Sequence, residues 1–187
     1  MKNIILVIML TITSLQAVAA DLYLLGGAGL VKTPSIQNAT PSEDPGNTQS
    51  LTAGWKIKNT VALELGYDRI GEINYKTPVL NVATGAYINK QFQRNVGRSV
   101  EIAALGIYPF TDDGFSWVGK IGMANTSFTY SNPDNLANVP SNYSKTSALA
   151  GVGVQFEGAD GTTLRLIGSR KSGGPMTSII GHIGVTF

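Results

Sequence analysis

The fold of this chain is decided by the pattern in residues 61–71, which read VALELGYDRIG. Every second residue of this stretch is large and apolar: Val61, Leu63, Leu65 and Tyr67. The residues between them are small or acidic. A period of two is the period of a β-strand, in which successive side chains point to opposite faces. This segment therefore predicts a strand with one apolar face and one face of small and charged side chains.

The same alternation recurs in seven other segments, near residues 22–31, 51–57, 100–108, 115–123, 147–156, 164–166 and 179–187. We expect eight strands of about ten residues, the length of a tilted strand that crosses a membrane. Short connections with turn residues (58–59, 110–114, 157–161) alternate with long polar ones (33–47, 71–99, 131–143, 171–175). Short periplasmic turns and long external loops are typical of outer-membrane barrels.

The composition decides which face meets the solvent. The chain is 43% hydrophobic and only 14% charged, with 22 glycines. A soluble barrel would carry an exterior rich in Lys and Glu, whereas here the face opposite the apolar one holds isolated charges among Gly and Ala. That face suits the narrow interior of a small barrel. We predict an all-β fold, an eight-stranded antiparallel up-and-down transmembrane β-barrel with short periplasmic turns and long extracellular loops.

Residues 1–20 differ from the rest of the chain. Lys2 precedes an apolar run at 4–10, and small residues stand at 17–20, which is the pattern of a cleaved signal peptide. We therefore expect a signal peptide at 1–20 and a single barrel domain at 21–187. Without its one lysine, the exported part carries 13 basic and 12 acidic residues. This near-neutral balance argues against nucleic-acid binding, and the absence of cysteine excludes disulfides and cysteine chemistry.

Three segments resemble a known family, the OmpA-type transmembrane domain. They are ELGYDRIG at 64–71 with Tyr75-Lys76 after it, LGIYPFTDD at 105–113 with Lys120-Ile-Gly after it, and GVTF at 184–187. The resemblance implies an outer-membrane location, and it implies that Phe187 ends the signal read by the outer-membrane assembly machinery. Small barrels of the Ail/OmpX and opacity-protein kind share this architecture. Since the chain ends at Phe187, we expect it to lack the periplasmic peptidoglycan-binding domain of full-length members.

The inward faces of the predicted strands carry a polar set that we expect to form a luminal network: Lys56, Glu64, Glu101, Lys120, Gln155 and Arg165. Buried charges persist only when they are paired. We predict that Glu64 pairs with Arg165 or Lys120. One interpretation is a polar plug that holds the barrel shut; the other is a switchable gate for a narrow ion path. The resemblance implies an acidic residue where this chain has Gln155.

Further predictions concern single positions. His182 is the only histidine, and we expect it to pack inside the lumen rather than to act in catalysis or bind zinc. Compared with the family that the chain resembles, Ile107 is an extra residue between Gly106 and Tyr108, which predicts a bulge. Residues 79–87 predict a hairpin, which leaves ten strands as an alternative to eight. Basic residues near the loop bases are candidate contacts to lipopolysaccharide phosphates: Arg94, Arg98, Arg170 and Lys171.

These patterns predict a non-catalytic outer-membrane barrel that presents surface loops, in envelope integrity, adhesion or host interaction. A narrow gated pore is the first alternative. The second is a lipid A-modifying barrel enzyme, which requires a Ser–His–acid set at the outer rim that the sequence does not display. We expect a monomer with no cofactor or metal. Its expected partners are outer-membrane lipids, lipopolysaccharide, the assembly machinery and an extracellular partner held by the loops.

Overall fold

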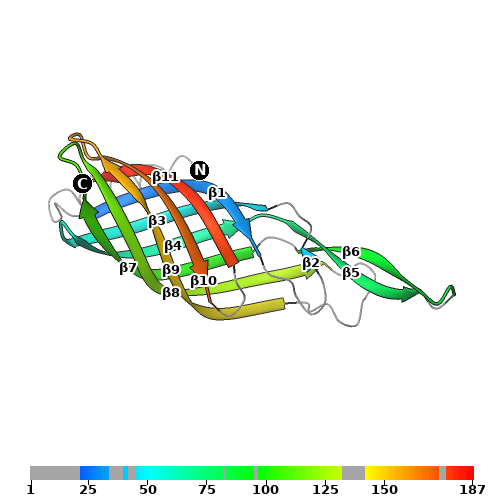
Figure 1. Cartoon of the computed structure of the whole chain (residues 1–187). Coiled ribbons are helices and arrows are strands. Elements are labelled where there is room, and N and C mark those ends of the chain that lie inside the picture. The colour runs from blue at the N-terminus through cyan, green and yellow to red at the C-terminus, as the bar shows by residue number, and fades with distance from the viewer. Residues whose placement is uncertain are drawn as a thin grey trace, which may run out of the picture.

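The computed structural model describes residues 22–33, 40–41, 45–81, 83–94, 97–131, 142–172 and 176–187. Eight long strands form its main body: β1 (Leu22–Lys32), β3 (Gly46–Lys58), β4 (Val61–Ile70), β7 (Gly97–Pro109), β8 (Phe115–Ser131), β9 (Asn142–Glu157), β10 (Thr162–Lys171) and β11 (Met176–Thr186). All pairings between them are antiparallel, in the order β8-β7-β4-β3-β1-β11-β10-β9, and the β8–β9 pairing closes the barrel (Figure 1). The predicted eight-stranded barrel is confirmed, and the described residues contain no helix.

Three shorter strands lie outside the barrel wall: β2 (Thr40–Pro41), β5 (Ile73–Asn81) and β6 (Ala86–Arg94). β5 and β6 pair along their whole length as a hairpin, and Gly85 in its turn has a positive φ of 66°. The hairpin extends away from one end of the barrel (Figure 1), and the end of β6 pairs with β8 of the wall. The hairpin predicted at 79–87 is therefore confirmed, and the ten-stranded alternative is wrong.

The short turns lie at the other end of the barrel, which we call the turn end; the end that bears β5 and β6 is the hairpin end (Figure 1). Gly114 and Gly161 adopt positive φ values of 92° and 81° in two of these turns, a conformation that glycine adopts without steric cost. In the second turn, the Asp160 carboxylate accepts hydrogen bonds from the Thr162 backbone N–H at 2.9 Å and hydroxyl at 2.8 Å. These hydrogen bonds hold the pKa of Asp160 below its usual value.

The barrel is apolar on the outside. In β4, exposed and buried positions alternate strictly. From Val61 to Asp68 the exposed residues are apolar and the buried ones are small or acidic, whereas at the hairpin end Arg69 is exposed and Ile70 is buried. Large apolar side chains are also exposed on other wall strands, where Ile102, Ile121 and Val152 are 67%, 69% and 74% exposed. Exposed aromatic residues gather near the turn end: Tyr108, Phe110, Phe115 and Trp117. A broad apolar belt with an aromatic girdle is the surface of a barrel embedded in lipid.

Strand β7 corrects one prediction. Its register with β8 runs without a shift from Arg98 opposite Ser127 to Pro109 opposite Ser116. Leu105 and Ile107 both point inward and are buried, while Gly106 and Tyr108 face outward. The bulge predicted at Ile107 is therefore wrong, because the strand accommodates this residue as an ordinary inward position. A shift of register is found instead in the pairing of β3 with β4, between Lys56 and Lys58.

Within the described ranges, no helix is long and apolar enough to cross a membrane.

Candidate functional site: a charged ladder in the lumen

The inward faces of four wall strands bring charged side chains together inside the barrel. Glu64 and Asp68 come from β4, Glu101 from β7 and Lys120 from β8. Arg165 and Lys171 come from β10, and all six side chains are buried. They reach one another because neighbouring inward positions are small. At Gly54 of β3, for example, an added Cβ would overlap the Tyr23 ring, so the glycine provides the space that the ring fills.

Glu64 is the centre of the part nearer the turn end. Its Oε1 accepts a hydrogen bond from the Tyr23 hydroxyl at 2.6 Å and forms an ion pair with Nη1 of Arg165. Arg165 also donates from Nε and Nη2 to Oε1 of Gln155, at 3.0 and 2.7 Å. The Arg165 guanidinium lies 5.4 Å from the centre of the Tyr23 ring. Nε, Nη1 and Nη2 of this guanidinium therefore all meet oxygens held by other strands.

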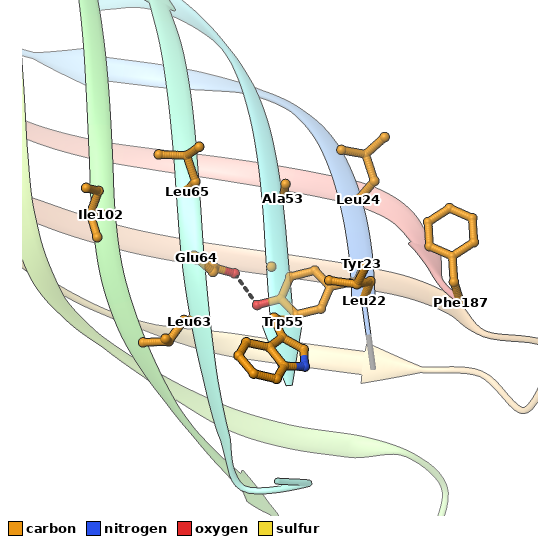
Figure 2. A pocket seen from close by; sticks show the side chains of 11 residues that line it. Leu22, Tyr23, Leu24, Ala53, Trp55, Leu63, Glu64, Leu65, Ile102 and Phe187 are labelled. Atoms are coloured by element: carbon orange, nitrogen blue, oxygen red, sulfur yellow. Dashed lines mark hydrogen bonds between the residues drawn. The ribbon is translucent and has the colours of Figure 1, made fainter. Parts of the chain in front are cut away.

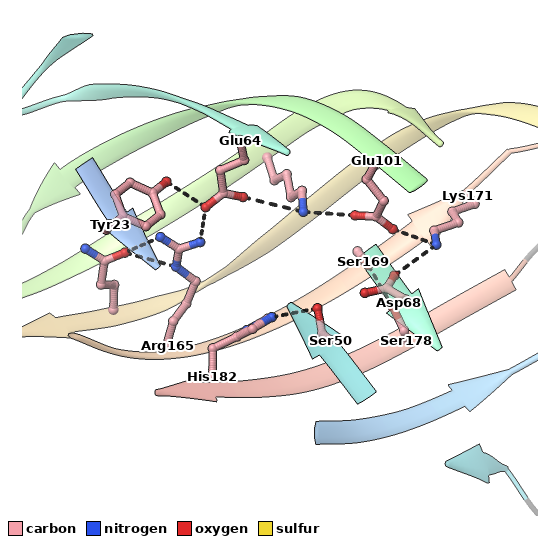
Figure 3. Close-up of polar contacts among 12 residues, drawn as sticks. Tyr23, Ser50, Glu64, Asp68, Glu101, Arg165, Ser169, Lys171, Ser178 and His182 are labelled. Carbon is pink, nitrogen blue, oxygen red and sulfur yellow. Dashed lines mark hydrogen bonds and ion pairs between the residues drawn. The ribbon is translucent and has the colours of Figure 1, made fainter. Parts of the chain in front are cut away.

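The ladder continues from Glu64 toward the hairpin end (Figure 3). Nζ of Lys120 lies 3.5 Å from Oε2 of Glu64 and 3.0 Å from Oε2 of Glu101. The other oxygen of Glu101 lies 2.6 Å from Nζ of Lys171, which in turn lies 3.4 Å from Oδ2 of Asp68. Positive and negative groups alternate along the ladder. Its three cations balance its three carboxylates, which is the condition for keeping charges out of water.

Of the predicted network residues, Lys56 lies apart from the ladder, whereas Gln155 is part of the network. Lys56 lies at the turn end, half-buried, and pairs with Glu157 instead of joining the ladder. Gln155 joins as the neutral acceptor of Arg165. Sequence reasoning missed Tyr23 as a member of the network, because the run LYLL at 22–25 hides which residues face inward.

Lys171 corrects the predicted set of lipopolysaccharide contacts. Only 3% of its surface is exposed, and it pairs with Glu101 inside the lumen. The alternation that places Arg165 inward also places Lys171 inward, six residues on, so the signal was present in the sequence. Arg98 and Arg170 do face outward and are exposed. The side chain of Arg94 lies outside the described part of the structure.

Two groups of buried apolar side chains, which we call the apolar plugs, lie on either side of the ladder. A buried cluster fills the turn end: Tyr23, Leu25, Ala62, Leu105, Ile107 and Val118. Toward the hairpin end, buried apolar side chains stand at the ends of four strands: Val31, Ile70, Phe128 and Met176. The Phe128 ring lies over Gly97, where an added Cβ would overlap it. Sequence reasoning missed these plugs, because it assigned the inward face to small and charged residues.

His182 contacts a serine, as a catalytic base would. Its Nε2 lies 3.3 Å from Oγ of Ser50, and its Nδ1 is buried and makes no hydrogen bond within the described residues. In a Ser–His–acid triad the carboxylate holds Nδ1. Here the carboxylate beside this pair is that of Asp68, which lies opposite Ser50 on the neighbouring strand and pairs with Lys171. The three residues therefore lack the order of a triad.

Among the described residues, no group of three or more His, Asp or Glu side chains lies close enough together to hold a metal ion.

An apolar groove of about 470 Å³ marks the outside of the wall near the turn end (Figure 2). Its lining is mostly exposed and apolar and includes Leu24, Trp55, Leu63, Leu65, Ile102 and Phe187 around the small Ala53. Tyr23 and Glu64 form its back wall, but they face the lumen and bond to each other there (Figure 2). Because this side of the wall is the lipid-facing one, the groove is a place for hydrocarbon rather than for a polar substrate.

A closed barrel with an apolar exterior and a paired polar interior defines the class of outer-membrane β-barrel proteins. The family model of the OmpA-like transmembrane domain matches residues 17–167. The chain belongs to this family, as the sequence resemblance predicts, and is an outer-membrane protein.

Several solved structures share the fold. The N-terminal barrel of OprF from Pseudomonas aeruginosa is 13% identical with a TM-score of 0.59, and the match covers 89% of this chain and 98% of that one. Neisserial surface protein A is 15% identical with a TM-score of 0.56, covering 89% and 97%. Ail of Yersinia pestis, in complex with the heparin analogue sucrose octasulfate, is 13% identical with a TM-score of 0.51, covering 89% and 99%. A comparison with curated proteins found no match.

Proposed function

We propose that this chain is a non-catalytic outer-membrane protein with a closed lumen, which presents the β5–β6 hairpin and its neighbouring loops to an extracellular partner. The observation that carries the proposal is the separation of the molecule into a closed barrel wall and the β5–β6 hairpin outside it. The wall encloses a ladder sealed by apolar plugs, while an additional hairpin extends from the end opposite the short turns. A closed wall and an extended external sheet favour surface interaction over transport.

The strand lengths support an external platform. A barrel strand needs about 9–11 residues to cross the membrane, whereas β8 has 17 residues and β9 has 16. At about 3.3 Å per residue, six further residues extend β8 by about 20 Å. The end of β6 pairs with the end of β8, so the hairpin continues this extension. The sheet therefore supports the hairpin beyond the membrane.

The hairpin is tested by replacing residues 73–94 with a short Gly-Ser linker in cells that display the chain. The probes are immobilised fibronectin, laminin and collagen, with surface display measured by antibody. We expect the intact chain to increase adhesion to at least one probe and the shortened chain to lose the increase at equal display. Adhesion that survives the deletion, or an intact chain that adheres no better than cells without it, contradicts the proposal.

The paired charges of the ladder favour a gated pore as the second candidate. Planar-bilayer conductance of the refolded protein separates the two candidates, with Glu64→Ala and Arg165→Ala compared to the parent chain. We expect negligible conductance in all three, because the apolar plugs remain when one ion pair is lost. A gate held by Glu64 and Arg165 predicts ion flow in the variants, and such flow would show that the ladder alone closes the lumen.

The enzyme alternative is tested by mass spectrometry of lipid A from cells with and without the protein. The Ser50–His182 contact lies inside the wall and lacks an acid on Nδ1, which supports a packing role. We expect identical acylation in the two samples. Altered acylation that disappears in Ser50→Ala would assign catalysis to this pair and overturn the non-catalytic proposal.

A further inference from the structure

Two arginines face each other on the outside of the barrel. Arg69 of β4 and Arg98 of β7 are directly opposite in the antiparallel register, and both are exposed. Side chains in such a pair start about 5 Å apart, and like charges placed this way destabilise a sheet. Adjacent outward positions are polar and uncharged, with Gln49 opposite Arg69 and Ser127 opposite Arg98.

Neither guanidinium has an ion-pair partner among the residues that the structure describes. Nε of Arg98 donates to Oγ of Ser127 at 3.3 Å, a contact that orients the side chain but leaves its charge uncompensated. The carboxylates of the neighbouring strands, such as Glu101 and Asp68, point into the lumen and are neutralised there. The repulsion between the two arginines therefore has no compensation from the barrel wall.

The height of the pair on the wall identifies its surroundings. Arg98 lies ten residues along β7 from Tyr108, which belongs to the aromatic girdle at the turn end. Ten residues span about 33 Å along a strand, or about 25 Å across the membrane at the usual tilt, which matches the height of the apolar band. The next outward pairs below the arginines are Tyr67 with Val100 and Leu65 with Ile102. The arginines therefore lie where the band ends and the outer headgroups begin.

We propose that Arg69 and Arg98 form a clip for a phosphate group of an outer-leaflet lipid. A phosphate between two guanidinium groups accepts paired, charge-assisted hydrogen bonds from each and converts their repulsion into attraction. Acyl chains of the same lipid run down the wall along Tyr67, Val100, Leu65 and Ile102. Arg170 is also outward and exposed but faces Ala150 and Thr177 across the strands, so it lacks a second cation. This proposal depends on the outer-membrane location of the barrel. It does not depend on the proposed surface role of the hairpin.

Native mass spectrometry of the detergent-solubilised full barrel tests the clip, with diphosphoryl lipid A, dephosphorylated lipid A and inorganic phosphate as separate probes. We expect Arg69→Gln/Arg98→Gln to weaken diphosphoryl lipid A binding at least ten-fold and Arg170→Gln to leave it within two-fold. Dephosphorylated lipid A is expected to bind all variants alike, and inorganic phosphate to bind far more weakly than the lipid. Equal loss in Arg170→Gln, or no loss in the double variant, overturns the proposal; tight binding of inorganic phosphate overturns its assignment to a lipid.

Unfolding by urea supplies an independent test, because the clip predicts that one substitution shifts the unfolding midpoint in opposite directions with and without lipid A. Without lipid A, Arg98→Gln removes the repulsion from Arg69 and is expected to raise the unfolding midpoint. With lipid A, the same substitution removes half of the clip and is expected to lower the midpoint relative to the parent chain. A shift of the same sign in both conditions contradicts the clip and indicates a structural effect of the side chain alone.

Discussion

At the scale of single residues, Glu64 shows why the lumen holds its arrangement. Its two oxygens face a phenol, a guanidinium and an ammonium that come from β1, β10 and β8. If the carboxylate were removed, the Tyr23 hydroxyl and Nη1 of Arg165 would lose their acceptor in a low-dielectric interior, whereas Lys120 would keep its ion pair with Glu101. The carboxylate therefore joins three strands of the wall through one buried group.

Replacement of Glu64 by Gln should destabilise the barrel by about 3–5 kcal/mol, because it leaves the Arg165 charge buried without a counter-ion. The double variant Glu64→Gln/Arg165→Met should recover part of this loss, since it removes the stranded charge. Urea unfolding in phospholipid vesicles, followed by the fluorescence of Trp55 and Trp117, measures both.

The matched control for this pair is Glu157→Gln, which breaks the half-exposed pair with Lys56 at the turn end. Ion pairs in contact with water contribute about 0–1 kcal/mol, so its effect should be small. Equal costs for Glu64→Gln and Glu157→Gln would show that the ladder is as accessible to water as the rim and would refute its buried character.

Gly54 tests the packing beside the ladder. Gly54→Ala places a methyl group where the Tyr23 ring lies, and overpacking of this kind typically costs about 1–3 kcal/mol. Gly106→Ala is the control, because the space around a Cβ at this outward position is open; its effect should stay within about 0.5 kcal/mol. The same unfolding experiment compares the two, and a stability of Gly54→Ala equal to that of the control would place the Tyr23 ring elsewhere.

At the scale of strands, the period of two decides which side chains face the lumen and which face the lipid. In β7 the inward residues Ala103, Leu105 and Ile107 alternate with outward Ile102, Gly106 and Tyr108 without interruption. The sequence resemblance favoured a bulge, whereas the hydrogen-bonded register with β8 keeps the strand regular. A one-residue slip would place every following side chain on the other face, so burial of one face enforces the register.

The regular register of β7 is testable with single cysteines, because the natural chain has none. Nitroxide labels at Ile102→Cys and Gly106→Cys should be accessible to lipid-dissolved oxygen in an electron paramagnetic resonance measurement. Labels at Ala103→Cys and Ile107→Cys should be shielded, because these positions face the lumen. Shielding that fails to alternate between Gly106 and Ile107 would indicate a bulge after all.

At the scale of the whole molecule, closure of the barrel depends on the two terminal strands. β11 pairs with β1 over ten residue pairs, from Tyr23–Thr186 to Lys32–Thr177. The backbone N–H of Phe187 donates to the carbonyl of Leu22 at 2.7 Å, and its ring lines the apolar groove on the lipid-facing side (Figure 2). The ring of Phe187 is thus available to the lipid.

Phe187→Ala should lower the amount of barrel assembled in cells several-fold, because it removes the terminal aromatic that the sequence resemblance assigns to the assembly signal. Refolding of the purified variant into detergent should proceed as for the parent chain, since the β1–β11 pairing is retained. Heat-modified migration in gels measures both. Normal assembly in cells would remove Phe187 from the signal, and failure in both settings would assign it to barrel stability instead.

The sequence by itself predicted eight strands, with ten left as an alternative, and it determined the facing of most strands, the hairpin within residues 71–99 and the inward position of Glu64, Glu101, Lys120 and Arg165. These features follow from a local period of two and from turn chemistry, which a chain displays without reference to distant residues. Lys171 was also readable from the alternation of β10, although its charge suggested an exposed role.

Only the tertiary structure decided which charges meet, where the apolar plugs lie and that Arg69 faces Arg98. Glu64 and Arg165 are 101 residues apart in the chain, and their contact depends on the stagger between strands on opposite sides of the barrel. Pairing across the lumen is set by barrel closure and strand tilt, which no local pattern encodes. The sequence therefore specifies the faces of the strands, and closure specifies which residues on those faces become partners.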